Sequence, residues 1–173
     1  MLEETYRAEQ RHFWFRGFRR FVLPFIQEAV SGLTRPLLLD CGCGTGSNLQ
    51  FLQRFGVPFG VDLAWRGLQF AHRNGLTRLA QGSVGSLPFL AGTMDVALSF
   101  DVLYCLEDEA ERRAIAEMRR VLRPGGALVV NAGMQALALL FAGSDSGGQN
   151  DMGLTFANPI HSVLSALRAT LLW

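Results

Sequence analysis

Lysine is absent from this sequence. All 16 basic residues are arginine, and they stand against 15 acidic residues. This absence excludes reactions that need a lysine amine, such as Schiff-base formation or the lysine of a Walker-type phosphate loop. The formal net charge of +1 lacks the excess of positive charge that extended nucleic acid requires. We therefore do not expect extended nucleic acid as a partner, although the arginines and aromatic residues near the N-terminus leave an anionic lipid or an RNA substrate open.

Cysteine and long apolar runs are also scarce. The odd set Cys41, Cys43 and Cys105, with no basic-then-apolar leader ahead of it, argues against a secreted disulfide framework and predicts a reducing, cytoplasmic setting. A zinc site needs about four ligands, which this spacing does not supply, so we expect no metal. No apolar run reaches the roughly 18 residues of a membrane span, so we expect no integral membrane segment.

The 173 residues, 49% of them hydrophobic, fit one domain with one core. From residue 37, short apolar runs alternate with helical patterns, which predicts an α/β fold with a mostly parallel sheet and helices on both faces. A capping box of Asp108 and Glu111 is expected to open the longest of these helices. The five expected strands are Leu37–Asp40, Val57–Asp62, Thr77–Gln81, Val96–Phe100 and Ala127–Asn131, and the helices are Ser47–Phe55, Trp65–Asn74 and Asp108–Leu122.

The N-terminal segment, residues 1–36, predicts an aromatic amphipathic helix with arginines opposite its apolar face. Pro24 is expected to kink or interrupt this helix, since proline removes a backbone donor. The favoured interpretation of the apolar face is simple packing on the domain. The alternatives are a helical lid over a pocket and a peripheral contact with a lipid surface.

A glycine-rich turn follows the first apolar strand and opens a helix. Glycines at positions 42, 44 and 46 allow positive φ angles and a close approach of the backbone to a ligand. In doubly wound folds, ligands bind at this edge of the sheet. The spacing Gly-x-Gly-x-Gly differs from the Gly-x-Gly-x-x-Gly fingerprint of dinucleotide-binding proteins, which disfavours a nicotinamide cofactor.

Two acidic residues flank this turn in sequence. Asp62 ends the second strand, where a carboxylate can accept both hydroxyls of a ribose; alternatively, it caps the helix that begins near Ala64. Asp40 precedes the first glycine and suits a positively charged ligand better than a pyrophosphate. S-adenosylmethionine, which carries an ammonium and a sulfonium and no phosphate, meets both conditions.

Five segments in order resemble the class I S-adenosylmethionine-dependent methyltransferases, in particular the small-molecule group known as type 11. The resemblance extends from about Leu37 to Asn131 and implies a Rossmann-like core over residues 37–131, S-adenosylmethionine as cofactor, and methyl transfer to a small molecule. The segments are Asp40-Cys-Gly-Cys-Gly-Thr-Gly46, Gly60-Val-Asp62, Gln81-Gly-Ser-Val-Gly-Ser-Leu-Pro-Phe89, Met94-Asp-Val-Ala-Leu-Ser-Phe-Asp-Val-Leu103 and Arg120-Val-Leu-Arg-Pro-Gly-Gly126.

The resemblance also implies roles for single residues. Asp62 is expected at the ribose, Leu63 at the adenine face, and Asp101 near the methionine ammonium or the substrate. The other cofactor residues that it implies are Asp40, Gly42, Cys43, Gly44 and Gly46 at the amino-acid end, with Ser83, where many members have an acid, and Val84 at the adenine.

The general base is left open by the sequence. Tyr104 and Cys105 stand where relatives often carry Glu-His, so no residue is assigned to that role. The candidates for a catalytic group are His12, Asp101 and Tyr104.

Residues 132–173 depart from the family, which normally adds an antiparallel hairpin after the fifth strand. After Arg123 only three charged residues remain, and the pattern gives a Gly- and Ser-rich loop over 143–153 and a helix over 162–172 but no hairpin. The sheet is therefore expected to lack that hairpin. Because the substrate side then looks incomplete, a non-catalytic cofactor-binding or partner module stands as the alternative to an enzyme. The sequence indicates neither the accepting atom nor the oligomeric state.

Overall fold

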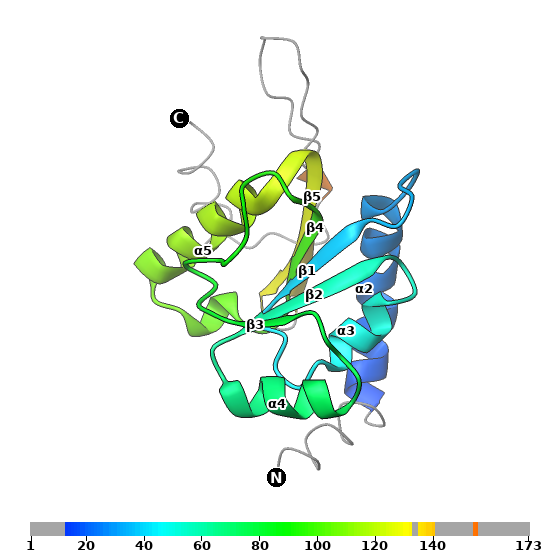
Figure 1. Cartoon of the computed structure of the whole chain (residues 1–173). Helices are drawn as coiled ribbons and strands as arrows, with labels where there is room; N and C mark the ends of the chain where they lie inside the picture. Colours follow the sequence, from blue (N-terminus) through cyan, green and yellow to red (C-terminus); the bar gives the residue numbers. More distant parts are fainter. Residues whose placement is uncertain (1–12, 133–134, 141–153, 156–173) are drawn as a thin grey trace.

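The computed structural model describes residues 13–132, 135–140 and 154–155. Within these residues, seven strands form one sheet in the order β3-β2-β1-β4-β5-β6-β7, and the first five of these are parallel to one another. This confirms the Rossmann-like, mostly parallel sheet with five principal strands (Figure 1). The strands are β1 (Leu37–Cys41), β2 (Val57–Asp62), β3 (Leu79–Gln81), β4 (Met94–Ser99), β5 (Leu122–Ala132), β6 (Gln135–Leu140) and β7 (Leu154–Thr155).

Helices cover both faces of the sheet. In Figure 1, α5 lies on one side, and α2 and α3 lie on the other, with α4 beside α3. The helices are α2 (Phe13–Ala29), α3 (Ser47–Leu52), α4 (Trp65–Arg73) and α5 (Asp108–Val121), and a short 3-10 helix, η1, spans Leu103–Cys105.

Strand alternation divides the core into two layers. In β1, Leu38 packs with α2 and α3, whereas Leu39 faces α5. Each of these leucines is fully buried, as expected for a parallel sheet that is covered on both faces. The sheet therefore holds the carboxyl ends of β1, β2, β4 and β5 in fixed positions along one edge.

Helix α2 forms part of this core. Val22 and Ile26 are buried against the sheet, and Phe18 meets Phe100 edge-on with 5.1 Å between ring centroids. This supports the simpler interpretation, in which the apolar face packs on the domain. The helix runs without interruption through Pro24, so the expected break is wrong, although the proline ring is exposed.

The structure differs from the sequence prediction at two further places. β6 pairs antiparallel with β5, and β7 pairs antiparallel with β6, where the pattern indicated no hairpin. The segment Gln135–Leu140 shows little polar alternation in its sequence, so it carries no strand signal of period two. Helix α5 begins without the capping box, because Glu107 is the N-cap and makes no side-chain cap bond. The predicted loop over 143–153 and helix over 162–172 lie outside the described residues.

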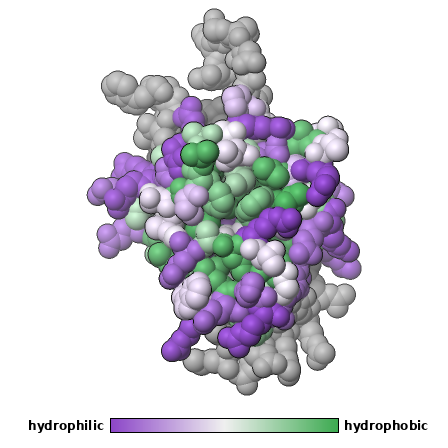
Figure 2. Space-filling view, viewed as in Figure 1, coloured by the Kyte–Doolittle hydropathy of each residue, from purple (hydrophilic) through white to green (hydrophobic). Residues whose placement is uncertain are grey.

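No helix in the described part of the chain is long and apolar enough to cross a membrane. Figure 2 shows apolar residues gathered in the middle of the face in view, with hydrophilic residues around them. Isolated exposed side chains contribute to the apolar surface of the molecule, among them Leu63, Trp65, Leu90 and Tyr104.

Candidate functional site

The glycine turn lies between the carboxyl end of β1 and the start of α3. Gly42, Gly44 and Gly46 all have positive φ angles, of 89°, 51° and 80°. The backbone amides of Gly42 and Cys43 both donate to the carbonyl of Val61, at 2.7 and 3.0 Å. These two bonds fasten the turn to β2, and the positive φ angles confirm the reason for glycine at these positions.

The three glycines meet different surroundings. A methyl group on Gly42 would lie 2.2 Å from a methyl of Val102, and one on Gly46 would lie 2.3 Å from Leu76. A methyl group on Gly44 would meet nothing within 4 Å. The middle of the turn therefore faces open space that a ligand can enter, while both ends are closely packed.

Asp62 joins this turn to the segment that follows β2. One carboxylate oxygen accepts the backbone N–H of Gly44 at 2.7 Å, and the other accepts that of Ala64 at 2.7 Å. Ala64 is the N-cap of α4. The bond to Ala64 therefore agrees with the expectation that Asp62 lies at the start of this helix, whereas the bond to Gly44 does not follow from it. An ionised carboxylate has about four acceptor positions, which leaves room for further donors.

Asp40 is buried at the end of β1, with 1% of its surface exposed. Its Oδ2 atom has no hydrogen-bond partner among the described residues. Burial, and then the neighbouring charge of Asp62, raise the pKa of this carboxyl from 3.8 to about 7. A buried acceptor without a partner is costly, so this oxygen favours a ligand that donates a hydrogen bond or carries positive charge.

Three residues expected at the adenine lie around the ends of β2 and β3. Leu63 directly follows Asp62 and exposes 68% of its surface. The Ser83 hydroxyl accepts the backbone N–H of Gly85 at 3.1 Å, and Val84 is buried in the layer that faces α5. The apolar side chain of Leu63 and the hydroxyl of Ser83 therefore lie at the surface.

Asp101 follows β4 and has a φ of 60°. Its backbone N–H donates to Oδ1 of Asn131 at 2.6 Å, and its Oδ1 accepts from Nδ2 of Asn131 at 2.8 Å. The sequence analysis missed Asn131, although a polar residue that ends an apolar strand is the same signal that identified Asp40 and Asp62.

The other catalytic candidates are placed differently. Tyr104 is exposed in η1, and slight burial together with the Asp101 carboxylate raises the pKa of its hydroxyl. The phenol is therefore protonated near neutral pH and can donate a hydrogen bond. His12 lies outside the described residues.

The three cysteines are free thiols, and Cys41 and Cys43 are buried. Burial, followed by the charge of Asp40, raises the pKa of both of these thiols, which keeps them protonated. In the part of the chain that the structure describes, no three His, Cys, Asp or Glu residues cluster as a metal site.

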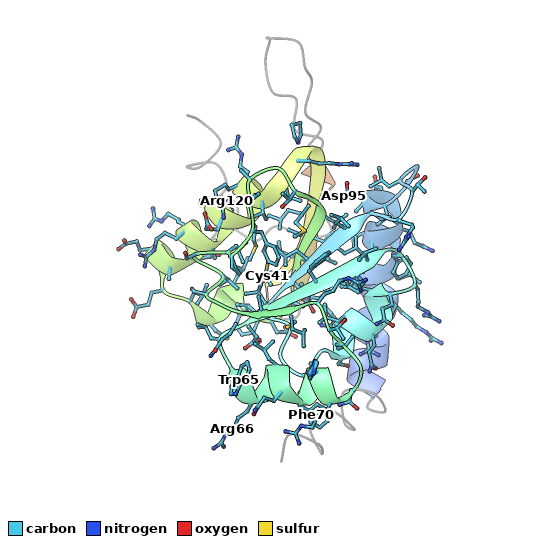
Figure 3. The ribbon with its side chains drawn as sticks, viewed as in Figure 1. Cys41, Trp65, Arg66, Phe70, Asp95 and Arg120 are labelled. Atoms are coloured by element: carbon cyan, nitrogen blue, oxygen red, sulfur yellow. The ribbon has the colours of Figure 1, made fainter. Side chains whose placement is uncertain are left out.

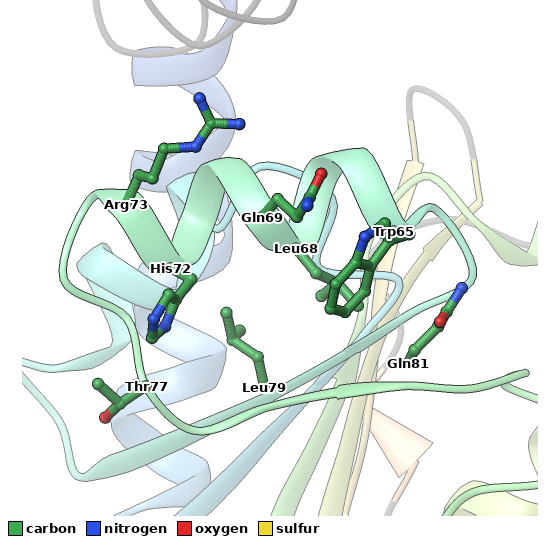
Figure 4. Close-up of a pocket in the computed structure, with 8 residues that line it drawn as sticks. All are labelled: Trp65, Leu68, Gln69, His72, Arg73, Thr77, Leu79 and Gln81. Carbon is green, nitrogen blue, oxygen red and sulfur yellow. The ribbon is translucent and has the colours of Figure 1, made fainter.

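A cavity of about 420 Å³ lies between α4 and β3 (Figure 4). Trp65, Leu68 and His72 point from α4 toward the strand, and Leu79 lies opposite them. Its remaining lining residues are Gln69, Arg73, Thr77 and Gln81. None of the site residues predicted from the sequence lines this cavity, so we place the candidate site at the glycine turn.

Residues 39–130 match the family model described as a methyltransferase domain. This match covers more than half of the chain, including the end of β1, the glycine turn and most of β5. The chain belongs to this methyltransferase family. The match to this type 11 family confirms the predicted resemblance to class I S-adenosylmethionine-dependent methyltransferases. The cofactor of the family is S-adenosylmethionine.

Individual relatives agree with this family. The chain is 37% identical over 97 residues to an Encephalitozoon cuniculi protein named as a methyltransferase, covering 54% of this chain and 43% of the relative. It is 28% identical to a malonyl-[acyl-carrier protein] O-methyltransferase of Herminiimonas arsenicoxydans, over 87% of this chain and 53% of the relative. A solved geranyl diphosphate methyltransferase in complex with S-adenosylmethionine is similar with a TM-score of 0.53 and 26% identity, over 62% of this chain and 46% of that one.

The chain spans about half the length of these curated relatives. The described residues of this methyltransferase domain nevertheless fit S-adenosylmethionine. Asp40 offers a buried carboxylate oxygen without a partner, which suits an ammonium group. Gly44 leaves open space at the turn, and Asp62 keeps acceptor positions beside it.

Proposed function

We propose that this chain is an S-adenosylmethionine-dependent methyltransferase that acts on a small molecule by in-line methyl transfer. Two observations carry the proposal: the buried Oδ2 of Asp40 has no hydrogen-bond partner among the described residues, and the middle of the glycine turn that follows Asp40 in the chain is open. A cation would stabilise the ionised form of this acid, and the cofactor of the family carries one in its methionine part.

In this proposal, different residues of the site bind different parts of the cofactor. Asp40 binds the ammonium, and the turn Gly42–Gly46, including Cys43, holds the amino-acid end by its backbone. Asp62 accepts the ribose hydroxyls while it keeps its bonds to Gly44 and Ala64. The adenine lies against Leu63, with Ser83 and Val84 on its other side.

Methyl transfer demands alignment more than acid or base chemistry. The cofactor supplies a methyl group on a sulfonium, which is a good leaving group. The chain's own contribution is to hold the acceptor atom, the methyl and the sulfur in line, because a fixed orientation removes much of the entropic barrier. The rigid edge formed by β1, β4 and β5 serves this purpose.

Asp101 and Tyr104 lie on the acceptor side in this proposal. Asp101 is exposed after the end of β4, and Tyr104 is exposed three residues further on, in η1. The raised pKa of the Tyr104 hydroxyl suits it to donate a hydrogen bond that orients an acceptor rather than to remove a proton. His12 stays a candidate base from the sequence alone.

A small molecule is the favoured acceptor class for two reasons. The names of two relatives give a malonyl group on its carrier and geranyl diphosphate as substrates of those proteins. The near-neutral net charge of this chain also lacks the electrostatic attraction that extended nucleic acid needs. The second candidate is the non-catalytic cofactor-binding or partner module that the sequence pattern left open.

Calorimetric titration with S-adenosylhomocysteine and then with NADH tests cofactor choice. Binding of the first and not of the second is expected, and the reverse result would overturn the proposal. Transfer of a labelled methyl group from S-adenosylmethionine to a malonyl thioester or to geranyl diphosphate then tests turnover. The Asp62→Ala variant, which should bind the cofactor weakly, is the negative control. Tight binding of S-adenosylhomocysteine without methyl transfer would favour the non-catalytic module.

A further inference from the structure

Asn131 ends the apolar run of β5 and is almost completely buried, with 1% of its surface exposed. It lies at the same edge of the sheet as the glycine turn, because β5 and β4 are parallel and the end of β4 neighbours β1. A buried side-chain amide is kept only where its donors and acceptors are paired. In this position the amide pairs with the chain segment that follows β4.

That segment contains the one non-glycine residue of the site with a positive φ. Asp101 has a φ of 60°, in the left-handed region that costs an L-residue energy, although aspartate tolerates it better than most. Two hydrogen bonds join Asp101 to Asn131. The Asp101 backbone N–H donates to Oδ1 of Asn131 at 2.6 Å, and Nδ2 of Asn131 donates to the Asp101 carboxylate at 2.8 Å. The backbone conformation and the direction of the carboxylate are thus fixed by one partner.

The next residue extends this constraint to the glycine turn. Val102 packs so closely on Gly42 that a methyl group there would lie 2.2 Å from a Val102 methyl. Gly42 in turn donates to the carbonyl of Val61. A shift of Asp101 would therefore move Val102 and release the first glycine of the turn.

We propose that Asn131 is a positioning residue that sets Asp101 and, through Val102, the glycine turn, so that the acceptor side and the cofactor side of the site move as one unit. The proposal rests on the proposed function, since it assigns the turn to the cofactor. Asn131 itself touches neither ligand. It acts by keeping Asp101 in its left-handed conformation.

The test uses two substitutions of opposite design in the full chain. Asn131→Leu is close in size and removes both hydrogen bonds. The double exchange Asp101→Asn with Asn131→Asp still permits two bonds, because the carboxylate at position 131 can accept from the backbone N–H and from the side-chain amide at position 101. We expect N131L to weaken S-adenosylhomocysteine binding about tenfold or more in calorimetry, and the double exchange to bind as Asp101→Asn does. Affinity of N131L within twofold of the wild type would overturn the proposal.

A local readout separates positioning from general destabilisation. Without ligand, hydrogen exchange over residues 42–46 should rise in N131L more than exchange over β2, and it should not rise in the double exchange. Asp95→Asn is the matched control, because Asp95, labelled in Figure 3, is a buried acid at the opposite end of β4. Its carboxylate pairs with Arg123 at 2.6 Å. This substitution should lower the unfolding temperature while leaving exchange over 42–46 and affinity unchanged.

The outcomes distinguish this proposal from the proposed function. If the wild type itself binds no S-adenosylhomocysteine, the proposed function fails, and the exchange data without ligand still decide the coupling between Asn131 and the turn. If the wild type binds and N131L changes neither affinity nor exchange at 42–46, only the positioning role fails.

Discussion

The carboxylate of Asp62 accepts a hydrogen bond from the backbone amide of Gly44 at 2.7 Å, so the acid that ends β2 holds the middle of the glycine turn. Its other oxygen accepts from Ala64, at the start of the segment that leads into α4. One side chain thus fixes the two loops that we propose to enclose the adenosyl part of the cofactor. Substitutions at Asp62 should therefore affect both loop position and ligand contact.

Replacing Asp62 with alanine is expected to weaken S-adenosylhomocysteine binding about 10- to 150-fold, because charge-assisted hydrogen bonds are worth roughly 1.5 to 3 kcal/mol. Asp62→Asn should lose less, since an amide keeps one acceptor. Calorimetric dissociation constants for the three proteins, with thermal unfolding alongside, measure the effect. Equal affinities in all three would remove Asp62 from the site.

The stability of the protein without cofactor should depend on pH through Asp40. Folding raises the pKa of this carboxyl to about 7, so the folded state holds the proton more tightly than the unfolded chain. The stability that the protonated acid contributes is therefore complete below about pH 4 and is lost as the pH rises to about 7. A rise in the pKa from 3.8 to about 7 corresponds to a loss on the order of 4 kcal/mol.

Urea unfolding of the wild type and of Asp40→Asn at several pH values between 4 and 8 checks this dependence. Other carboxyl groups titrate in both proteins, so the effect of Asp40 is read from the difference between their free energies of unfolding. Asp40→Asn should become progressively more stable than the wild type as the pH rises. A difference that stays constant over this range would contradict the prediction.

Alanine at Gly42 and at Gly44 should separate folding from ligand binding. Both changes place a side chain at positive φ, at a cost of roughly 1 to 2 kcal/mol. At Gly42 the new methyl also collides with Val102, which adds about 1 to 3 kcal/mol of strain. At Gly44 it enters open space, so the protein should fold but lose cofactor affinity.

Chemical unfolding and titration with S-adenosylhomocysteine measure this pair of glycine variants. The expected order is that Gly42→Ala is the less stable of the two, and that Gly44→Ala binds at least tenfold more weakly than the wild type. Unimpaired binding by a folded Gly44→Ala protein would place the ligand elsewhere.

A lid over the cofactor remains the alternative role predicted for residues 1–36, beside the packing of α2 on the domain. Arg19 of α2 donates to the backbone carbonyl of Ser47 at 3.1 Å and also to its hydroxyl, at the point where the glycine turn enters α3. Ordering of the turn by S-adenosylhomocysteine should therefore slow hydrogen exchange over residues 13–22. Residues 23–29, which include the fully buried Ile26, serve as the internal control. If hydrogen exchange over residues 13–22 is the same with and without S-adenosylhomocysteine, the prediction of a lid is wrong.

The sequence by itself determined the order of the five parallel strands and of the helices between them, the glycine turn and the acid at the end of β2. The glycines at 42, 44 and 46 have the positive φ angles that their spacing predicted, and β2 has the predicted bounds, Val57–Asp62. These features depend on residues that are neighbours in the chain. Apolar periodicity and the freedom of glycine are local properties, so a sequence pattern is sufficient to predict them.

Only the tertiary structure decided the relationships between segments far apart in the chain. Asp101 and Asn131 are separated by 30 residues, and Arg19 and Ser47 by 28. The unbroken course of α2 through Pro24 likewise depends on its packing against the sheet, which outweighs the lost backbone bond. The raised pKa of Asp40 has the same origin, because burial by the surrounding strands and the charge of Asp62 exist only once the parallel sheet has brought the ends of β1 and β2 together.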